Sequence, residues 1–438
     1  MKRAVFVLFI CLLYNPLFAQ YTISGGNGES YPYTEDLSGT GIEAVYLLNT
    51  LNNAIISYSS SAVSVKFHRY RYSLADKTEI PQSDISTDTN GNTTVYTVSN
   101  LMDGYGYLVE ENGGLRAAVW IIDYNTHQPI LTSIETIEEE DKCEFLKLFI
   151  TKSDELSFYT NGGAKKDIRR EYTITYNNLE WDAEQMKFVE KTTTLPTQEI
   201  GTEVIINAPL MNTKFTLREE DRIAEHFKAK SITSTEYNAI AVEAQILTEQ
   251  ERRNAANEKI TDGSDLGGSA PATIHFYGYG NEPITGYYTW FIYNQADMKN
   301  PIARYTDRDI KYTFERAGGY TVRLEVADQS SICADTTSVS FNISESFLDV
   351  PNYFSPGDSP GSNDEFRVAY KSLVRFKCTI FNRWGIKLYQ WTDPAKGWDG
   401  KHNGRYVPTG VYFYAIEAEG SDGIKYKKGG DINVFRTR

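Results

Sequence analysis

The pattern that most limits the fold of this sequence is an alternation of apolar and polar residues in short segments, separated by Gly, Asn, Asp and Pro. Residues 63–67 and 94–98 alternate with period two, as expected of strands that bury one face, because successive side chains of a strand point to opposite sides. Asn90 and Gly91 form a typical hairpin-turn pair. Residues 117–122 are a continuous apolar run that suits a buried strand. These signals predict antiparallel β-sandwiches.

Composition also indicates an all-β chain with several domains. The 438 residues include 31 Tyr and 21 Phe but 5 Met and 5 His, a bias toward residues that favour strands. At about 100–150 residues per domain, the length predicts three or four domains. The net charge of −14 argues against nucleic-acid binding, which usually requires a basic surface.

The first 19 residues have the features of a cleaved signal peptide. Lys2 and Arg3 precede an apolar run over residues 4–13, and Ala19 is a small residue at the expected cleavage site. The run is shorter than the roughly 20 residues that span a bilayer, and no second run of this kind follows. We therefore expect an exported chain without a transmembrane segment.

Three cysteines remain after removal of the signal peptide, namely Cys143, Cys333 and Cys378. In an oxidising compartment this odd number permits at most one internal disulfide. Because the three fall in different predicted domains, burial as small apolar side chains is favoured over a bridge. Their spacing matches no Cys/His metal site.

Breaks in the alternation divide the mature chain into four predicted domains. A stretch rich in Gly, Ser and Asp at 261–271 is typical of a linker. The predicted ranges are 1–19 for the signal peptide, 20–140 for an immunoglobulin-like β-sandwich, 141–262 for a second β-sandwich, 270–345 for a third sandwich, and 347–438 for a small C-terminal β-sandwich.

Two segments of the second predicted domain are less regular. Residues 218–228 place apolar residues four positions apart and predict one short helix. Residues 236–256 are rich in Ala and Glu, which suits a helix, but alternation favours a strand. The alternating apolar positions are Ile240, Val242, Ala244 and Ile246.

Residues 314–326, followed by Cys333-Ala-Asp335-Thr336, resemble the second half of a PKD-like domain. This family is an immunoglobulin-type sandwich common in bacterial surface proteins. The chain departs from the family at residues 291–293, Phe-Ile-Tyr, where a Gly-Asp-Gly turn is frequent. The resemblance implies a PKD-like domain at 270–345.

Residues 347–438 contain several separate blocks of Pro, Asn, Asp, Gly and aromatic residues in a fixed order. The residues of these blocks are Pro351, Asn352, Phe354, Pro356, Asn363, Asp364, Phe366, Phe381, Asn382, Arg383, Trp384, Gly385, Trp398, Asp399, Gly400, Gly404, Pro408, Gly410 and Tyr412. In this order and spacing they resemble the gliding-motility-associated C-terminal domain, the type B sorting domain of type IX secretion cargo in Bacteroidota. The loop 355–364 departs from the compact Asn-Gly-Asp-Gly turn of the family. The resemblance implies recognition by the type IX translocon and a PorP/SprF-type outer-membrane barrel as an export partner.

Charge sets this C-terminal segment apart. Residues 347–438 contain 14 Lys+Arg and 10 Asp+Glu, a net charge of +4, whereas residues 20–346 contain 28 and 48, a net charge of −20. A basic module thus follows an acidic passenger.

No catalytic, cofactor or metal residues are predicted. The five histidines are isolated in sequence, and neither a His-Glu-x-x-His nor a Gly-x-Ser-x-Gly motif occurs. The loop from Asp358 to Asp364 offers oxygen ligands of the kind that calcium takes, but its spacing matches no calcium motif, so calcium is left open.

We therefore expect a non-enzymatic protein of the cell surface or extracellular medium, whose sandwiches serve adhesion, glycan or protein binding, or surface structure. Two alternatives remain: a surface hydrolase with its active site in residues 20–265, and an accessory component of the secretion or gliding apparatus.

Overall fold

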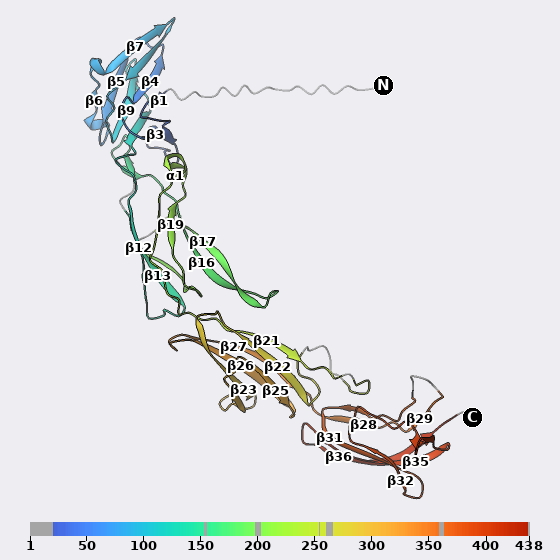
Figure 1. The fold of residues 1–438 in the computed structure, drawn as a ribbon. Coiled ribbons are helices and arrows are strands. Elements are labelled where there is room, and N and C mark those ends of the chain that lie inside the picture. The colour runs from blue at the N-terminus through green and yellow to red at the C-terminus, as the bar shows by residue number, and fades with distance from the viewer. Residues whose placement is uncertain are drawn as a thin grey trace, which may run out of the picture.

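The computed structural model describes residues 21–152, 156–197, 203–253, 255–259, 266–358 and 363–436. The predicted signal peptide at 1–19 lies outside these ranges. Strands dominate, and within the described ranges α1 (Arg222–Phe227) is the only α-helix. This confirms the predicted all-β class. Figure 1 shows the sheets in an extended series, with the first and last sheets at opposite ends.

The first unit is a sandwich of two sheets. Its strands are β1 (Tyr21–Ser24), β2 (Tyr31–Tyr33), β3 (Ile42–Leu48), β4 (Ile55–Ser60), β5 (Val65–Tyr70), β6 (Thr78–Glu79), β7 (Ile85–Asn90), β8 (Thr93–Val98), β9 (Tyr105–Glu111), β10 (Gly114–Leu115) and β11 (Ala118–Asp123). One sheet has the order β1–β4–β8–β7, and the other has the order β2–β3–β11–β9–β5–β6, with β10 on β9. Tyr58 and Val109 are completely buried between the sheets. Gly91 takes a φ of +63° in the β7–β8 turn, as the Asn-Gly pair predicted.

The second unit contains two facing sheets, β12–β13–β18 and β17–β16–β19–β20. The strands are β12 (Leu131–Ile137), β13 (Phe145–Lys152), β14 (Ser157–Tyr159), β15 (Lys165–Asp167), β16 (Tyr172–Asp182), β17 (Lys187–Thr197), β18 (Glu203–Asn207), β19 (Thr216–Glu219) and β20 (Ser231–Thr233). Leu148, Ile174 and Phe215 are completely buried between them. The β14–β15 hairpin instead packs Leu156 and Phe158 against the first unit.

The third unit pairs the sheet β21–β22–β25 with the sheet β24–β23–β26–β27. Its strands are β21 (Gln245–Gln250), β22 (Ala272–Tyr279), β23 (Thr285–Asn294), β24 (Ala303–Tyr305), β25 (Asp309–Phe314), β26 (Gly318–Asp328) and β27 (Ala334–Ile343). Along β26, every second side chain from Tyr320 to Val326 is buried. The period-two alternation of this segment therefore corresponds to strands of a sandwich with one buried face. The assignment of residues 270–345 as a PKD-like domain stays a prediction.

The terminal module is built on a five-stranded sheet with the order β29–β36–β35–β31–β32. Its strands are β28 (Phe347–Asp349), β29 (Tyr353–Phe354), β30 (Ala369–Lys371), β31 (Leu373–Phe381), β32 (Lys387–Trp391), β33 (Lys401–His402), β34 (Arg405–Tyr406), β35 (Gly410–Gly420) and β36 (Lys425–Val434). β28 pairs with β30, and β33 pairs with β34, as two small additional ladders.

The hydrogen-bonded sheets cross two of the predicted domain boundaries. β12 lies entirely within the range 20–140 but pairs with β13 of the second unit. β21 lies within the range 141–262 but pairs with β22 of the third unit. The Gly- and Ser-rich stretch at 261–271 therefore connects two strands of one sheet. As boundaries of independently folding domains, the four ranges stay predictions.

The two irregular segments form a shorter helix and a shorter strand than their patterns suggested. Asp221 caps α1 by accepting a hydrogen bond from the amide of Ala224. The segment 236–256 forms a strand only from Gln245. Of the alternating positions, Ala244 is buried in the core of the third unit, and Val242 and Ile246 are partly buried against it. Before them the buried side chains are Tyr237, Ala239 and Ala241, while Ile240 is only partly buried, so the alternation predicted burial from residue 242 onward but not before it.

A disulfide joins the second unit to the third. Cys143, in the loop between β12 and β13, is bonded to Cys333, in the turn between β26 and β27. This corrects the expectation that burial was favoured over a bridge for these cysteines. The expectation failed because residues of different sandwiches can still meet where two units abut. Cys378 is a free thiol buried in the terminal module.

Buried polar groups also fix the joints on either side of the third unit. The Asn281 side chain has no exposed surface, and its Nδ2 donates to the carbonyls of Leu210 and Ala241 at 2.7 and 2.9 Å. On the other side, the Ser372 amide donates to Ser269 Oγ at 2.8 Å, while the Ala270 amide donates to Ser372 Oγ at 3.1 Å. Satisfied polar groups of this kind make each joint specific in orientation.

We predict that peptide mapping under non-reducing conditions will recover the peptide containing Cys143 joined to the peptide containing Cys333. Cys378 should react with iodoacetamide only after unfolding, because its side chain is inaccessible and burial raises the pKa of its thiol. Alkylation of Cys143 or Cys333 in the folded, unreduced protein would contradict the assignment.

Candidate functional site

Several of the predicted sorting residues form the aromatic core of the terminal module. Phe354, Phe366 and Trp398 are at most 1% exposed. The ring of Trp398 lies 5.4 Å from that of Phe354 and 5.7 Å from that of Tyr412. Its Nε1 donates to the carbonyl of Lys401 at 2.9 Å. These residues hold the module together and do not present a surface.

The turn at Asp399 and Gly400 shows why glycine is required there. Gly400 has a φ of +74°, and a Cβ added at this position would lie 2.7 Å from Cγ of Pro356. Asp399 Oδ1 accepts the amide of Lys401 at 3.0 Å. The predicted residues Pro356, Asp399 and Gly400 are therefore brought together by close packing.

The turn between β31 and β32 has a different character, because it presents a side chain to solvent. Asn382 Oδ1 accepts the amides of Trp384 and Ile386 at 3.0 and 2.9 Å, and Gly385 has a φ of +77°. Trp384 is 70% exposed, with the guanidinium of Arg383 at 4.3 Å from its ring. The turn thus holds an exposed tryptophan in a defined place.

The remaining predicted sorting residues lie at strand ends and turns. Gly404 and Gly410 have positive φ, as does Asn363. The Tyr412 hydroxyl donates to the carbonyl of Pro408 at 2.9 Å. The other placements are Pro351 and Asn352 just before β29, Asp364 accepting the Gly357 amide, and Phe381 at the end of β31. Residues 359–362, in the loop from Asp358 to Asp364 for which calcium was left open, lie outside the described residues.

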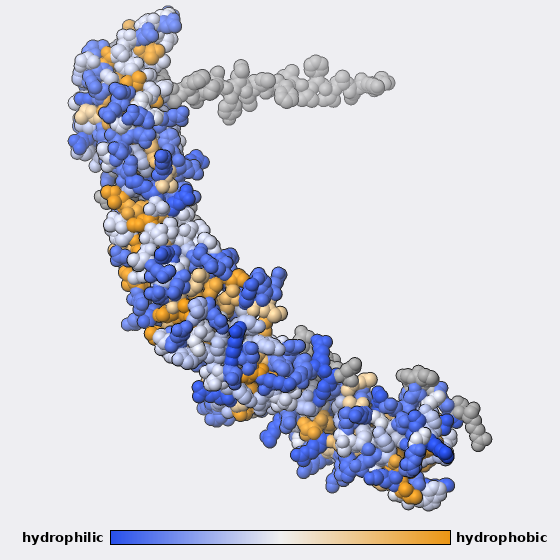
Figure 2. All heavy atoms as spheres, in the orientation of Figure 1, coloured by the Kyte–Doolittle hydropathy of each residue, from blue (hydrophilic) through white to orange (hydrophobic). Residues whose placement is uncertain are grey.

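An exposed apolar surface surrounds the turn that carries Trp384. Phe413 pairs in register with Phe381, which places it beside this turn. We call the exposed residues Trp384, Ile386, Val411 and Phe413 the tip patch; they are 70%, 58%, 49% and 42% exposed. Figure 2 shows hydrophobic residues at this far end of the module.

The tip patch includes three residues that the sequence analysis missed. In β35, Val411 and Phe413 alternate with the buried Tyr412, so the outer face of this strand is also apolar. The sequence thus contained a signal for an exposed apolar surface, namely apolar residues on both faces of this strand. An exposed apolar patch of this kind usually marks an interaction surface.

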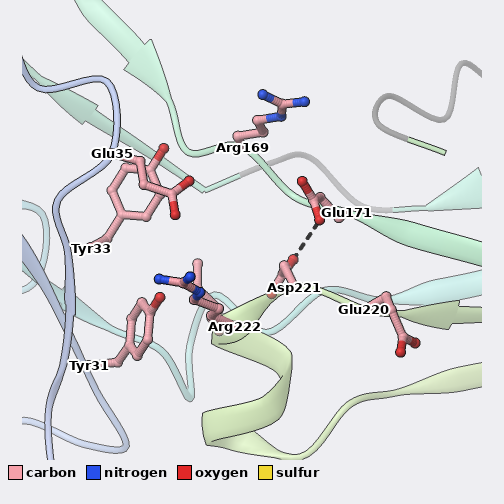
Figure 3. A pocket seen from close by; sticks show the side chains of 9 residues that line it. Tyr31, Tyr33, Glu35, Arg169, Glu171, Glu220, Asp221 and Arg222 are labelled. Atoms are coloured by element: carbon pink, nitrogen blue, oxygen red, sulfur yellow. Dashed lines mark hydrogen bonds between the residues drawn. The ribbon is translucent and has the colours of Figure 1, made fainter. Parts of the chain in front are cut away.

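A second candidate surface is a cleft between the first and second units. The cleft has a volume of about 350 Å³ and is lined by β2 on one side and by residues 169–171 and 220–223 on the other. Figure 3 shows Arg222 directed toward Tyr31 and Tyr33 of β2, with the carboxylate of Glu35 nearby. We call this space the junction cleft.

A buried ion cluster supports the wall of the junction cleft. Arg170 Nε donates to Asp221 Oδ2 at 2.6 Å, and Arg170 Nη2 donates to Glu219 Oε1 at 2.7 Å. The side chains of Arg170 and Glu219 are 2% and 0% exposed. The amide of Glu171 also donates to Asp221 at 3.1 Å, the bond drawn in Figure 3. These contacts fix the start of α1, which packs Phe227 on Tyr124 of the first unit.

Two histidines of the first unit each pair with a single carboxylate. The structure holds no group of three His, Cys, Asp or Glu residues suited to a metal ion within its described residues. His68 pairs with Glu110, and His127 pairs with Asp103, at separate places. The helix of the described chain is also too short to cross a membrane.

Comparison with known protein families identifies two regions. Residues 348–433 match the CHU_C type IX secretion signal domain, which confirms the resemblance seen in the sequence. Residues 135–235 match a fibronectin type III domain, an immunoglobulin-like sandwich in the second unit. No curated protein matches this sequence.

Among solved structures, dimeric latent PorU from Porphyromonas gingivalis aligns at 12% identity, over 70% of this chain and 34% of that chain, with a TM-score of 0.18. Immunoglobulin domains 1–5 of Sidekick-1 align at 11% identity, over 87% of this chain and 77% of that chain, with a TM-score of 0.23. The chain thus spans about a third of the PorU structure. Neither structure superposes closely, so neither bears on function.

We predict that Trp384→Ala will change the free energy of unfolding by less than about 0.5 kcal/mol, as is usual for exposed positions. Trp398→Ala, its matched buried control, should cost about 3–5 kcal/mol because it leaves a cavity. Calorimetry of the mature chain would measure both effects on the transition of the terminal module. Equal losses for the two variants would show that Trp384 also supports the core.

We further predict that Arg170→Gln will destabilise the second unit by about 3–5 kcal/mol, because it leaves two buried carboxylates without a counter-charge. Arg169→Gln, at the exposed neighbouring position, should change stability by less than about 0.5 kcal/mol. Thermal unfolding of the two variants tests the pair, and a mild effect of Arg170→Gln would exclude the ion cluster as the support of the junction cleft.

Proposed function

The terminal module is a type IX secretion signal domain, and we propose that it delivers a non-enzymatic adhesive protein to the bacterial cell surface. The chain is an exported cargo protein with immunoglobulin-like domains. In the proposal, residues 1–19 act as a cleaved signal peptide and the host belongs to the Bacteroidota. The match over residues 348–433 is the observation that carries the proposal.

The tip patch is the surface that we propose for recognition during export. Its four apolar side chains are exposed although the same module buries a complete aromatic core. Exposed aromatic residues of this kind are typical centres of protein interfaces. The export partners in this proposal are the type IX translocon and a PorP/SprF-type outer-membrane barrel.

Adhesion is supported by the arrangement of the other three units. They form an extended series in which the first unit lies far from the terminal module (Figure 1). Bonds across the joints, such as Cys143–Cys333 and the contacts of Asn281, favour one orientation of neighbouring units. Such a series would hold the first unit away from the surface to which the terminal module delivers it, where it would meet a glycan or protein ligand.

We predict that deletion of residues 348–433 will leave the chain in the periplasm, because the signal peptide still functions but the sorting domain is gone. Cell fractionation and protease shaving of intact cells would measure the location. The full-length chain with Trp384→Ala should remain folded yet reach the surface less efficiently. Surface display of the deletion variant would refute the sorting role, and normal display of the Trp384 variant would remove the tip patch from the proposal.

A further inference from the structure

The first unit contains a second hollow, with a volume of about 330 Å³, at one end of its larger sheet. β5 ends there at Tyr70, β9 begins there at Tyr105, and β11 runs toward the same end. The β14 strand of the second unit closes one side through Tyr159. Four segments that are distant in sequence therefore form this space, which we call the aromatic cavity.

Aromatic rings form one wall of the aromatic cavity. Tyr72 is 51% exposed, and its ring meets that of Tyr159 edge to face at 5.2 Å. The ring of Trp120 lies 6.1 Å from that of Tyr159, and Trp120 is 2% exposed. An exposed tyrosine ring fixed against other rings offers a flat apolar surface at little entropic cost.

Polar groups complete the lining. His127 Nε2 lies 2.7 Å from Asp103 Oδ2, while Asp103 Oδ1 accepts the amide of Asp123 at 2.8 Å. The position of Asp103 is therefore fixed by two contacts. Trp120 Nε1 is buried without a hydrogen-bond partner in the described structure, which is unusual for an indole.

The aromatic cavity also carries a positive charge that no described carboxylate pairs with. The guanidinium of Arg71 lies 5.5 Å from the Tyr72 ring and 5.9 Å from the Tyr105 ring, and it forms no ion pair with a described residue. The one carboxylate in the lining, Asp103, is bonded to His127. In contrast, four carboxylates accompany the two arginines that line the junction cleft.

The net negative charge of residues 20–346 does not cancel the positive charge of Arg71. At physiological salt the Debye length is about 8 Å, so distant exposed charges are largely screened. A ligand in direct contact with Arg71 would still form a charge-assisted hydrogen bond, because guanidinium matches the geometry of a carboxylate.

We propose that the aromatic cavity binds an oligosaccharide that carries a carboxylate group. The apolar face of a sugar ring packs on Tyr72, hydroxyl groups bond to Asp103 and His127, and the carboxylate pairs with Arg71. This assignment rests on the proposed adhesive function and specifies its ligand class.

Calorimetric titration of the mature chain with hexagalacturonate, a hyaluronan hexasaccharide and neutral cellohexaose tests the proposal. We expect at least one acidic oligosaccharide to bind, and to bind at least about tenfold more tightly than cellohexaose. Arg71→Gln and Tyr72→Ala should each weaken that binding by about tenfold or more. Tyr287→Ala and Arg375→Gln, at residues 56% and 81% exposed in other units, are the matched controls and should bind as the parent does.

Failure of both acidic oligosaccharides to bind would overturn the proposal, as would unchanged binding in both cavity variants. Equal binding of cellohexaose would overturn the carboxylate requirement. Two further measurements test the adhesive function separately from the ligand of the cavity. The chain length of the oligosaccharide after incubation shows whether the protein cleaves it, and protease shaving of intact cells shows whether the protein reaches the surface. Cleavage of the oligosaccharide, or absence of the chain from the surface, would refute that function whatever the cavity binds.

Discussion

The extended series depends on polar groups that are buried where consecutive units meet. Asn281 is fully buried at the joint between the second and third units, and Ser372 is fully buried at the joint between the third unit and the terminal module. Each has its partners in place, and the loss of a partner for a buried polar group costs about 1–3 kcal/mol. A change in the angle between units would break these contacts. The joints therefore set the direction of the whole molecule, while the sandwich cores only hold each unit together.

The local alternation of apolar and polar residues was sufficient to predict the all-β class, but it did not predict which strands share a sheet. Alternation predicted the sandwich strands because burial of one face is a local property of a strand. The pairing of β21 with β22 crosses a stretch of Gly and Ser that resembles a linker, and only the sheet itself reveals the pairing. The Cys143–Cys333 bridge was missed for a related reason, since the contact between two units depends on their relative placement.

The terminal module shows the same limit at the level of single residues. Trp384 and Trp398 both precede a turn that contains glycine, yet one is 70% exposed and the other is fully buried. The family resemblance selected both and gave no means of telling a core residue from a surface residue. The aromatic cavity lay beyond sequence reasoning altogether, because its wall combines residues from β11, from β14 and from the segment that follows β5.

The disulfide between the second and third units has a consequence for a protein exposed to proteases outside the cell. The bonded residues are 190 positions apart in the sequence. A single cut in the peptide chain between Cys143 and Cys333 would therefore produce two fragments that stay covalently joined. The first unit would remain attached to the terminal module after such damage, and the nicked molecule would part only when the disulfide was reduced.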